Sequence, residues 1–175
     1  MEINPVKILI TGPPGCGKTM LIKRIAHNLP YPVNGFFTAE IRKGGIRVGF
    51  EVESFAGEKA ILSHVDIRSK NRVGKYGVDI EAFEKIALPE IEKAIEENNL
   101  LIIDEIGKME LFSLRFRDLT VAAFDGRIPV IATILYKPLP FCDRLISLPG
   151  VEIMELGRDN FESSMKEILV RLAIS

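Results

Sequence analysis

This chain of 175 residues has few cysteines and little net charge, which excludes several classes of binding site. Its two cysteines, Cys16 and Cys142, are far apart and lack the spacing of metal ligands, so no cysteine-based metal site is expected. The net charge is −1, which excludes a general basic field for nucleic acid or an anionic membrane but leaves a local patch open. Glutamine and tryptophan are absent, and the loss of thermolabile amides is weak compositional evidence of a heat-adapted source.

Long uncharged apolar runs are missing, and the residues that follow Met1 do not resemble a leader peptide. We therefore expect neither a membrane span nor a signal peptide, and we expect a cytoplasmic protein. The length favours one domain over residues 1–175, which is large enough to bury a core. A hydrophobic content of 47% and a charged content of 27% fit an ordinary soluble globular chain.

A glycine-rich stretch between a short β-branched run and a helical pattern carries the clearest chemistry. Gly12, Gly17, Lys18 and Thr19 fit the P-loop pattern G-x-x-x-x-G-K-[ST], in which backbone N–H groups and a helix N-terminus bind phosphate oxygens. Lys18 would bind the β- and γ-phosphates, and the Thr19 hydroxyl would bind Mg²⁺. Cys16 is either a reactive thiol or, as we favour, a small space-filling residue. The predicted nucleotide-binding loop comprises Gly12, Pro13, Pro14, Gly15, Cys16, Gly17, Lys18 and Thr19.

Strand and helix patterns alternate along most of the chain, which predicts an α/β domain with a mainly parallel sheet. Strands are expected at residues 6–11, 35–42, 47–55, 60–65, 100–104, 128–134 and 151–155. Helices are expected at residues 18–28, 80–98, about 111–124 and 160–173.

Two segments depart from this alternation. Between residues 35 and 65 strand follows strand, and Gly44-Gly45 is a hairpin signal, so we expect a small antiparallel β insert. The helix at 80–98 has an apolar stripe that should face the sheet, but Pro89 lies inside it and predicts a kink or a break.

A second motif indicates what happens to the phosphate. Asp104 follows four apolar residues, which predicts a buried parallel strand that ends in a carboxylate. Ligands in open α/β sheets bind at the carboxyl ends of strands, so Asp104 should lie beside the phosphate loop and bind Mg²⁺ as a Walker-B acid. Glu105 follows directly and would polarise a water for in-line attack. We therefore predict transfer to water, against the alternative that Glu105 is a surface residue at a strand end.

Other polar residues would complete this site. Thr133 ends the next strand-like run and would sense the γ-phosphate or orient the water, although a β-favouring threonine without a role explains it equally well. The transition state also needs a cation near its equatorial oxygens, and Lys108 is favoured because it lies three residues after Glu105. The other candidates, each also explained as a solvated surface charge, are Arg42, Arg115, Arg117 and Arg144.

Five segments, GPPGCGKT, GFFTAEIR, GFEV, YGVD and DEIGKMELF, carry a family likeness, and the last is highly specific. Through them the chain, from Lys7 to about Phe161, resembles the small nucleoside-triphosphatase family first known from thermophiles, whose human relative is called cancer-related nucleoside-triphosphatase. The resemblance implies a RecA/AAA-like P-loop fold. It also implies Mg²⁺-dependent hydrolysis of several nucleoside triphosphates to diphosphate and phosphate, with Asp104 and Glu105 as the acidic pair.

Residues outside the main motifs have further roles that the resemblance and the sequence suggest. Glu40 and Arg42 match a TxEIR segment and would contact the phosphate or Mg²⁺ edge or, equally, form a hairpin salt bridge. Arg158 stands where relatives often show an Asn-Arg pair, with Gly157 in place of the asparagine, and could stack on the base. Because the chain has no N-K-x-D guanine-reading sequence, we expect broad use of ATP, GTP, CTP and UTP.

Two rival functions share these motifs. A nucleotide or small-molecule kinase would use the same P-loop, with residues 35–78 as an acceptor lid, but Glu105 and the lack of an arginine-rich lid argue against it. A nucleotide-binding module activated by a protein partner would also look similar, and the sequence identifies no such partner. Arg42, Lys43 and Arg47 could touch nucleic acid, although a solvated hairpin edge is favoured.

Overall fold

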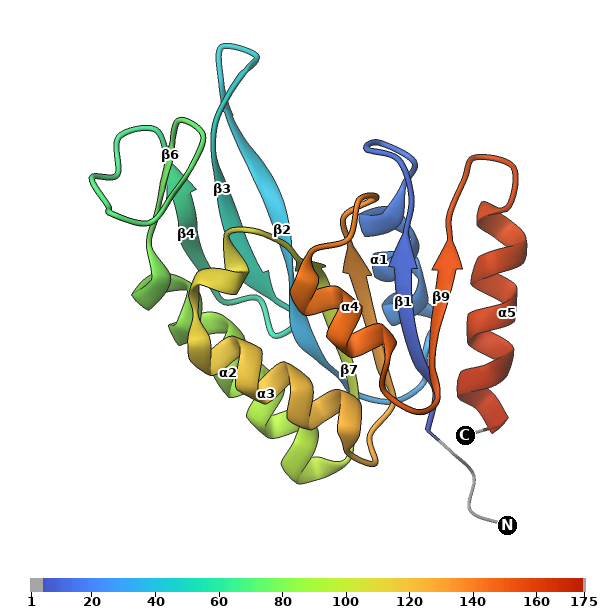
Figure 1. Cartoon of the computed structure of the whole chain (residues 1–175). Helices are drawn as coiled ribbons and strands as arrows, with labels where there is room; N and C mark the ends of the chain where they lie inside the picture. Colours follow the sequence, from blue (N-terminus) through green and yellow to red (C-terminus); the bar gives the residue numbers. More distant parts are fainter. Residues whose placement is uncertain (1–4, 175) are drawn as a thin grey trace.

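The computed structural model describes residues 5–174 and confirms the predicted α/β fold. One nine-stranded sheet has the order β5-β6-β4-β3-β2-β7-β8-β1-β9, with helices on both faces (Figure 1). Its strands are β1 (Lys7–Thr11), β2 (Val33–Lys43), β3 (Ile46–Ser54), β4 (Lys59–His64), β5 (Arg72–Val73), β6 (Tyr76–Val78), β7 (Leu100–Ile106), β8 (Val130–Ile134) and β9 (Val151–Glu155). The helices are α1 (Lys18–Asn28), α2 (Ile80–Glu97), the 3₁₀ turn η1 (Glu110–Phe112), α3 (Leu114–Asp125), α4 (Pro140–Ile146) and α5 (Phe161–Ile174).

The parallel half of the sheet comprises β2, β7, β8, β1 and β9, which pair in parallel from neighbour to neighbour. Successive residues of β1 point to opposite faces, so Ile8 and Ile10 belong to the core cluster that contains residues of α1 and α5, while Leu9 belongs to the cluster that contains residues of α2, α3 and α4. Strands buried on both faces explain why this half reads as short, nearly continuous apolar runs. Within residues 5–174, no helix has the length and apolar character needed to cross a membrane.

The antiparallel half, termed the extension, runs from Thr38 in β2 to Val78 in β6. It is built on β2, which pairs in parallel with β7 over its first residues and antiparallel with β3 from Phe36 to Lys43. Gly44 and Gly45 both have positive φ in the β2–β3 turn, as the hairpin signal predicted. The extension continues past the expected limit of residue 65, because the short strands β5 and β6 add to its edge.

Helices α3 and α4 differ from the expectation, and α2 shows no break. Helix α2 is unbroken at Pro89, whose exposed ring faces away from the buried stripe that includes Phe83 and Ile91. Helix α3 begins at Leu114 instead of about 111, because the Ser113 side chain caps it by accepting a hydrogen bond from the Phe116 N–H at 3.0 Å. Helix α4 was not predicted, since its seven residues are too few to show a helical period.

Candidate active site

The glycine-rich loop connects β1 to α1 at the carboxyl edge of the parallel half (Figure 1). Glycine is required at position 12, since a Cβ there would lie 2.3 Å from the Leu156 carbonyl oxygen. The Lys18 ammonium donates to the Gly12 carbonyl oxygen at 2.9 Å, so its charge lies against the loop. Cys16 is half-buried, and its sulfur packs 2.8 Å from where that Cβ would be, which agrees with a space-filling role.

The segment between β9 and α5 packs beside this loop. The Leu156 N–H donates to the Thr11 carbonyl oxygen at 2.7 Å, and the Phe161 ring lies 3.3 Å from a Cβ built on Gly17. Asn160 closes the segment by accepting from the Gly157 N–H at 2.8 Å. Arg158 is exposed in this segment, so it lies on the phosphate-loop side of the sheet, and its stacking on a base stays a prediction.

Asp104 lies near the end of β7, with β8 between its strand and β1. The side chain is buried, and its Oδ1 accepts a hydrogen bond from the Thr133 hydroxyl of β8 at 2.6 Å. Its Oδ2 is buried and has no partner with normal hydrogen-bond geometry among the described residues. Burial raises the pKa of Asp104, and the Thr133 and Thr19 hydroxyls and the Lys18 charge oppose that rise.

This arrangement fits a divalent cation. Asp104 offers a buried oxygen without a partner, and Thr19 is close enough for its hydroxyl to lower the pKa of that carboxyl. No group of three or more His, Cys, Asp or Glu residues that could hold a metal occurs in the described part of the chain. Mg²⁺ commonly takes only one or two protein carboxylates, with waters and substrate phosphates as its other ligands, so Thr19 and Asp104 are a suitable pair.

Glu105 extends from the same strand into a cavity of about 270 Å³. Burial and the adjacent Asp104 charge raise the pKa of Glu105 to about 7, while the Lys18 charge lowers it. A carboxylate with a pKa near neutrality is suited to accept a proton during catalysis at that pH. The cavity is lined by Thr38, Phe50, Leu62, Val73, Glu105, Lys108, Met109, Glu110 and Leu135.

Glu110 is a buried carboxyl that sequence reasoning missed, although it lies in the same motif. It is 4% exposed, and burial followed by the Glu105 charge raises its pKa to about 8. A Cβ built on Gly107 would lie 2.9 Å from Glu110 Oε2 and 3.0 Å from Glu105 Oε1, so these oxygens are at most about 6 Å apart. Nothing in the residue type distinguished Glu110 from a surface glutamate; its burial comes from the turn η1.

Of the five predicted cations, Lys108 alone lines the cavity that Glu105 lines, and its side chain is exposed. Arg115 lies 3.8 Å from Glu84 and 3.9 Å from Glu92, on the face of α2 and α3. Arg117 donates to the Leu111 carbonyl oxygen at 2.6 Å, and Arg144 is exposed on α4.

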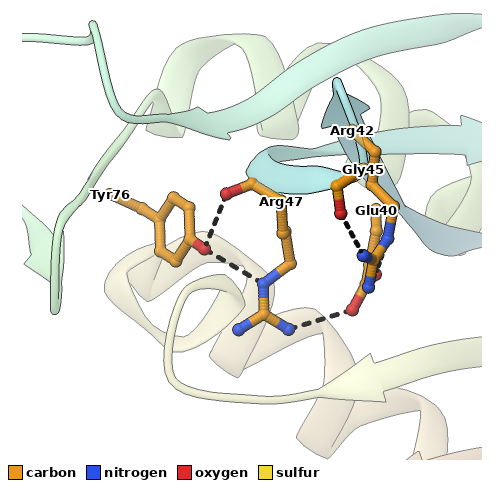
Figure 2. Close-up of polar contacts among 5 residues, drawn as sticks. All are labelled: Glu40, Arg42, Gly45, Arg47 and Tyr76. Carbon is orange, nitrogen blue, oxygen red and sulfur yellow. Dashed lines mark hydrogen bonds and ion pairs between the residues drawn. The ribbon is translucent and has the colours of Figure 1, made fainter.

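The other predicted cation, Arg42, belongs to a polar cluster on the extension (Figure 2). Glu40 accepts from Arg42 at 2.6 Å and from Arg47 at 2.9 Å, and the two guanidinium groups lower its pKa, Arg47 most strongly. Arg47 also donates to the Tyr76 hydroxyl at 3.0 Å, which ties β3 to β6. The structure therefore shows the hairpin salt bridge, one of the two roles considered for Glu40 and Arg42.

Comparisons with known proteins agree with this geometry. A family model described as NTPase matches residues 7–169. A protein named nucleoside-triphosphatase THEP1 from Thermotoga petrophila is 46% identical over 164 residues, which cover 94% of this chain and 91% of that protein. The human cancer-related nucleoside-triphosphatase is 34% identical over 181 residues, covering 93% of this chain and 94% of its own.

Solved structures extend the agreement to three dimensions. The crystal structure of THEP1 from the hyperthermophile Aquifex aeolicus matches with a TM-score of 0.87 at 40% identity, covering 95% of this chain and 99% of that one. The solution structure of a human cancer-related nucleoside triphosphatase matches with a TM-score of 0.83 at 33% identity, covering 97% and 98%. The expected P-loop architecture is thereby confirmed.

Proposed function

We propose a specific reaction for this chain, which belongs to the NTPase family and is a nucleoside-triphosphatase. In this proposal it hydrolyses ATP, GTP, CTP and UTP to diphosphate and phosphate, and the reaction depends on Mg²⁺. One observation supports water as the acceptor above all. Glu105 follows Asp104 on β7, its pKa is raised by burial and lowered by the Lys18 charge, and its side chain lines a cavity. A base in that place can take a proton from a water beside the γ-phosphate.

Each residue has a distinct part in this reaction. The loop N–H groups and Lys18 bind the β- and γ-phosphates, and Glu105 accepts the proton of the attacking water. Thr19 and Asp104 would hold Mg²⁺, which supplies positive charge at the phosphate oxygens. Thr133 holds the Asp104 carboxylate in place through its hydroxyl, and Lys108 is the cation assigned to the developing charge.

Broad base use is the second part of the proposal. Arg158 is exposed beside the phosphate loop, where a planar guanidinium can stack on any base. Stacking does not read hydrogen-bonding edges, so we expect similar rates with the four ribonucleoside triphosphates.

The test is phosphate release with ATP, GTP, CTP and UTP, with and without Mg²⁺, by the wild type and by Glu105→Gln. We expect release without any acceptor, only with Mg²⁺, and a loss of at least ~10²-fold in the variant with nucleotide binding retained. Glu58→Gln, in the exposed β3–β4 turn, is the control and should match the wild type. If the wild type binds nucleotide but releases no phosphate, a partner-activated module would replace the hydrolase.

A further inference from the structure

Glu105 lies at the inner end of two adjoining hollows. The inner cavity is the space of about 270 Å³ that Glu105 lines, and the outer groove, of about 600 Å³, runs on from it along the extension and α4. Val73 and Lys108 line both, so the two hollows meet at these residues. No residue of the phosphate loop lines either one within residues 5–174, which leaves the nucleotide a separate place.

The inner cavity has a mainly apolar lining with a few polar groups. Phe50 and Leu62 of the extension and Met109 and Leu135 of the opposite wall provide its apolar surface. Its hydrogen-bonding groups are the Thr38 hydroxyl, the two carboxyl groups and Lys108. A volume of this size holds a small organic body far better than it holds a single water.

The outer groove has the opposite charge. Arg72, Lys108 and Arg117 line it, and among the described residues no Asp or Glu does. Arg72 donates to the Lys75 carbonyl oxygen at 2.8 Å and Arg117 to the Leu111 carbonyl oxygen at 2.6 Å, so neither charge is neutralised by these contacts. Phe112 and Phe141 add aromatic surface. A basic, partly aromatic groove suits an organic anion.

We propose that the inner cavity and the outer groove together bind a small organic anion that carries a hydroxyl group. Its anionic end lies at Arg72, Lys108 and Arg117, and its hydroxyl lies at Glu105. There the hydroxyl accepts the phosphoryl group in place of water. The ligand is thus a second substrate, and hydrolysis is the reaction of the same site when water takes the hydroxyl's place. This inference rests on the role proposed for Glu105 as a general base. A base placed there can deprotonate a bound hydroxyl as well as a water, so Glu105 alone does not argue against an organic acceptor, contrary to the expectation from sequence.

The transfer balances without any further reactant. The hydroxyl oxygen forms a bond to the γ-phosphorus, and the bond from that phosphorus to the β–γ bridging oxygen breaks. The nucleoside diphosphate leaves with the electron pair, and Glu105 receives the hydroxyl proton. The product is a phosphate ester of the organic anion.

Glu110 favours a hydroxyl at this end of the ligand. Its pKa of about 8 keeps it neutral near pH 7, so it can donate a hydrogen bond as well as accept one without adding a second negative charge. The polar end of the ligand would therefore meet one carboxylate, one carboxylic acid and the Thr38 hydroxyl.

Binding is tested first, without nucleotide or Mg²⁺, by ligand-observed NMR with 4-(hydroxymethyl)benzoate and its analogue 4-methylbenzoate. Both should bind the wild type, and Arg72→Glu and the cavity-filling Val73→Trp should each weaken binding at least about tenfold. Lys70→Glu makes the same charge change two residues before Arg72, outside β5, but Lys70 lines neither hollow, so this variant should bind as the wild type does. Equal binding by all four proteins, each shown to be folded by circular dichroism, would overturn the site.

Transfer is tested next by ³¹P NMR with Mg²⁺ and ATP at probe concentrations that saturate the site. The hydroxymethyl probe should yield a phosphate ester. The methyl probe should slow the release of inorganic phosphate and should yield no ester. If the bound hydroxymethyl probe yields only inorganic phosphate, the acceptor role is wrong. Glu105→Gln separates this result from the proposed function, because it should abolish phosphate release while probe binding persists; full phosphate release by that variant would instead count against the role of Glu105.

Discussion

The parallel half of the sheet and the extension differ in the burial and the pKa of their carboxyl groups. In the parallel half Asp104 is buried, and burial raises its pKa despite nearby hydroxyls and lysine charge. In the extension Glu40 is exposed between two guanidinium groups, which lower its pKa. This difference indicates which carboxylate can take part in catalysis. A buried carboxylate without a hydrogen-bond partner can bind a cation, whereas an exposed carboxylate that is already in ion pairs contributes little beyond surface charge.

Lys18→Ala should have the largest effect, because it removes the mobile charge of the phosphate loop. We expect phosphate release to fall by about 10²- to 10³-fold, the usual cost of losing one group that stabilises transition-state charge. Lys43→Ala removes an exposed charge of the extension and should stay within about twofold of the wild type. Steady-state phosphate release by both variants makes the comparison, and equal losses would contradict it.

A pair of buried threonines tests the same contrast through stability. Thr133 and Thr120 are both 0% exposed, but Thr133 donates to Asp104 whereas the Thr120 hydroxyl has no partner among the described residues. Thr133→Val should therefore lower the free energy of unfolding by about 1–3 kcal/mol, and Thr120→Val should leave it unchanged or raise it slightly. Urea unfolding measures both, and a costly Thr120→Val would show that the hydroxyl has an unseen partner.

The pH dependence of hydrolysis tests the raised pKa of the carboxyl group of Glu105 in the parallel half. Glu105 must be ionised to accept a proton, and its pKa is raised to about 7, so activity should rise with pH through neutrality. Between pH 8 and pH 6 the rate should fall about tenfold, as the ionised fraction falls. Residual release by Glu105→Gln should lack this step. A wild-type rate that stays constant down to pH 5 would mean that another group accepts the proton.

Glu40→Gln should have the smallest effect. Its ion pairs with Arg42 and Arg47 are exposed, so their loss should cost under about 1 kcal/mol of stability and less at high salt. Urea unfolding at low and high ionic strength measures this. A loss above about 2 kcal/mol that ignores salt would mean that Glu40 anchors the extension as firmly as Thr133 anchors Asp104.

The parallel half could be predicted from sequence because its signals are local. A short apolar run that ends in Asp104-Glu105 shows strand, burial and chemistry within a few residues, and so does the loop from Gly12 to Thr19. The extension could be predicted only in its first three strands, β2, β3 and β4. Strands β5 and β6 have two and three residues, too few for an alternating pattern. They join the sheet through the pairing of β6 with β4 and β5, and Tyr76 of β6 accepts a hydrogen bond from Arg47 of β3.

Parts of the site depend on contacts that local patterns do not contain. Glu110 is buried because η1 turns it under Glu105, and a glutamate at that position looks like any surface residue in the sequence. Both roles considered for Arg42 were compatible with its sequence context, and the choice came from Glu40, which pairs with Arg42 at 2.6 Å and, across the hairpin, with Arg47 of β3 at 2.9 Å. Such contacts are made by segments that approach one another only after folding.

Strand β2 belongs to both halves of the sheet, with Phe37 in register beside Asp104 of β7 and opposite Glu53 of β3. The extension is therefore no detachable module. A cut that removes it must fall inside β2, directly after Phe37, which is the residue that pairs with Asp104, the proposed metal ligand. Grafting another extension onto this protein would require keeping β2 whole and replacing only the residues after its turn at Gly44-Gly45.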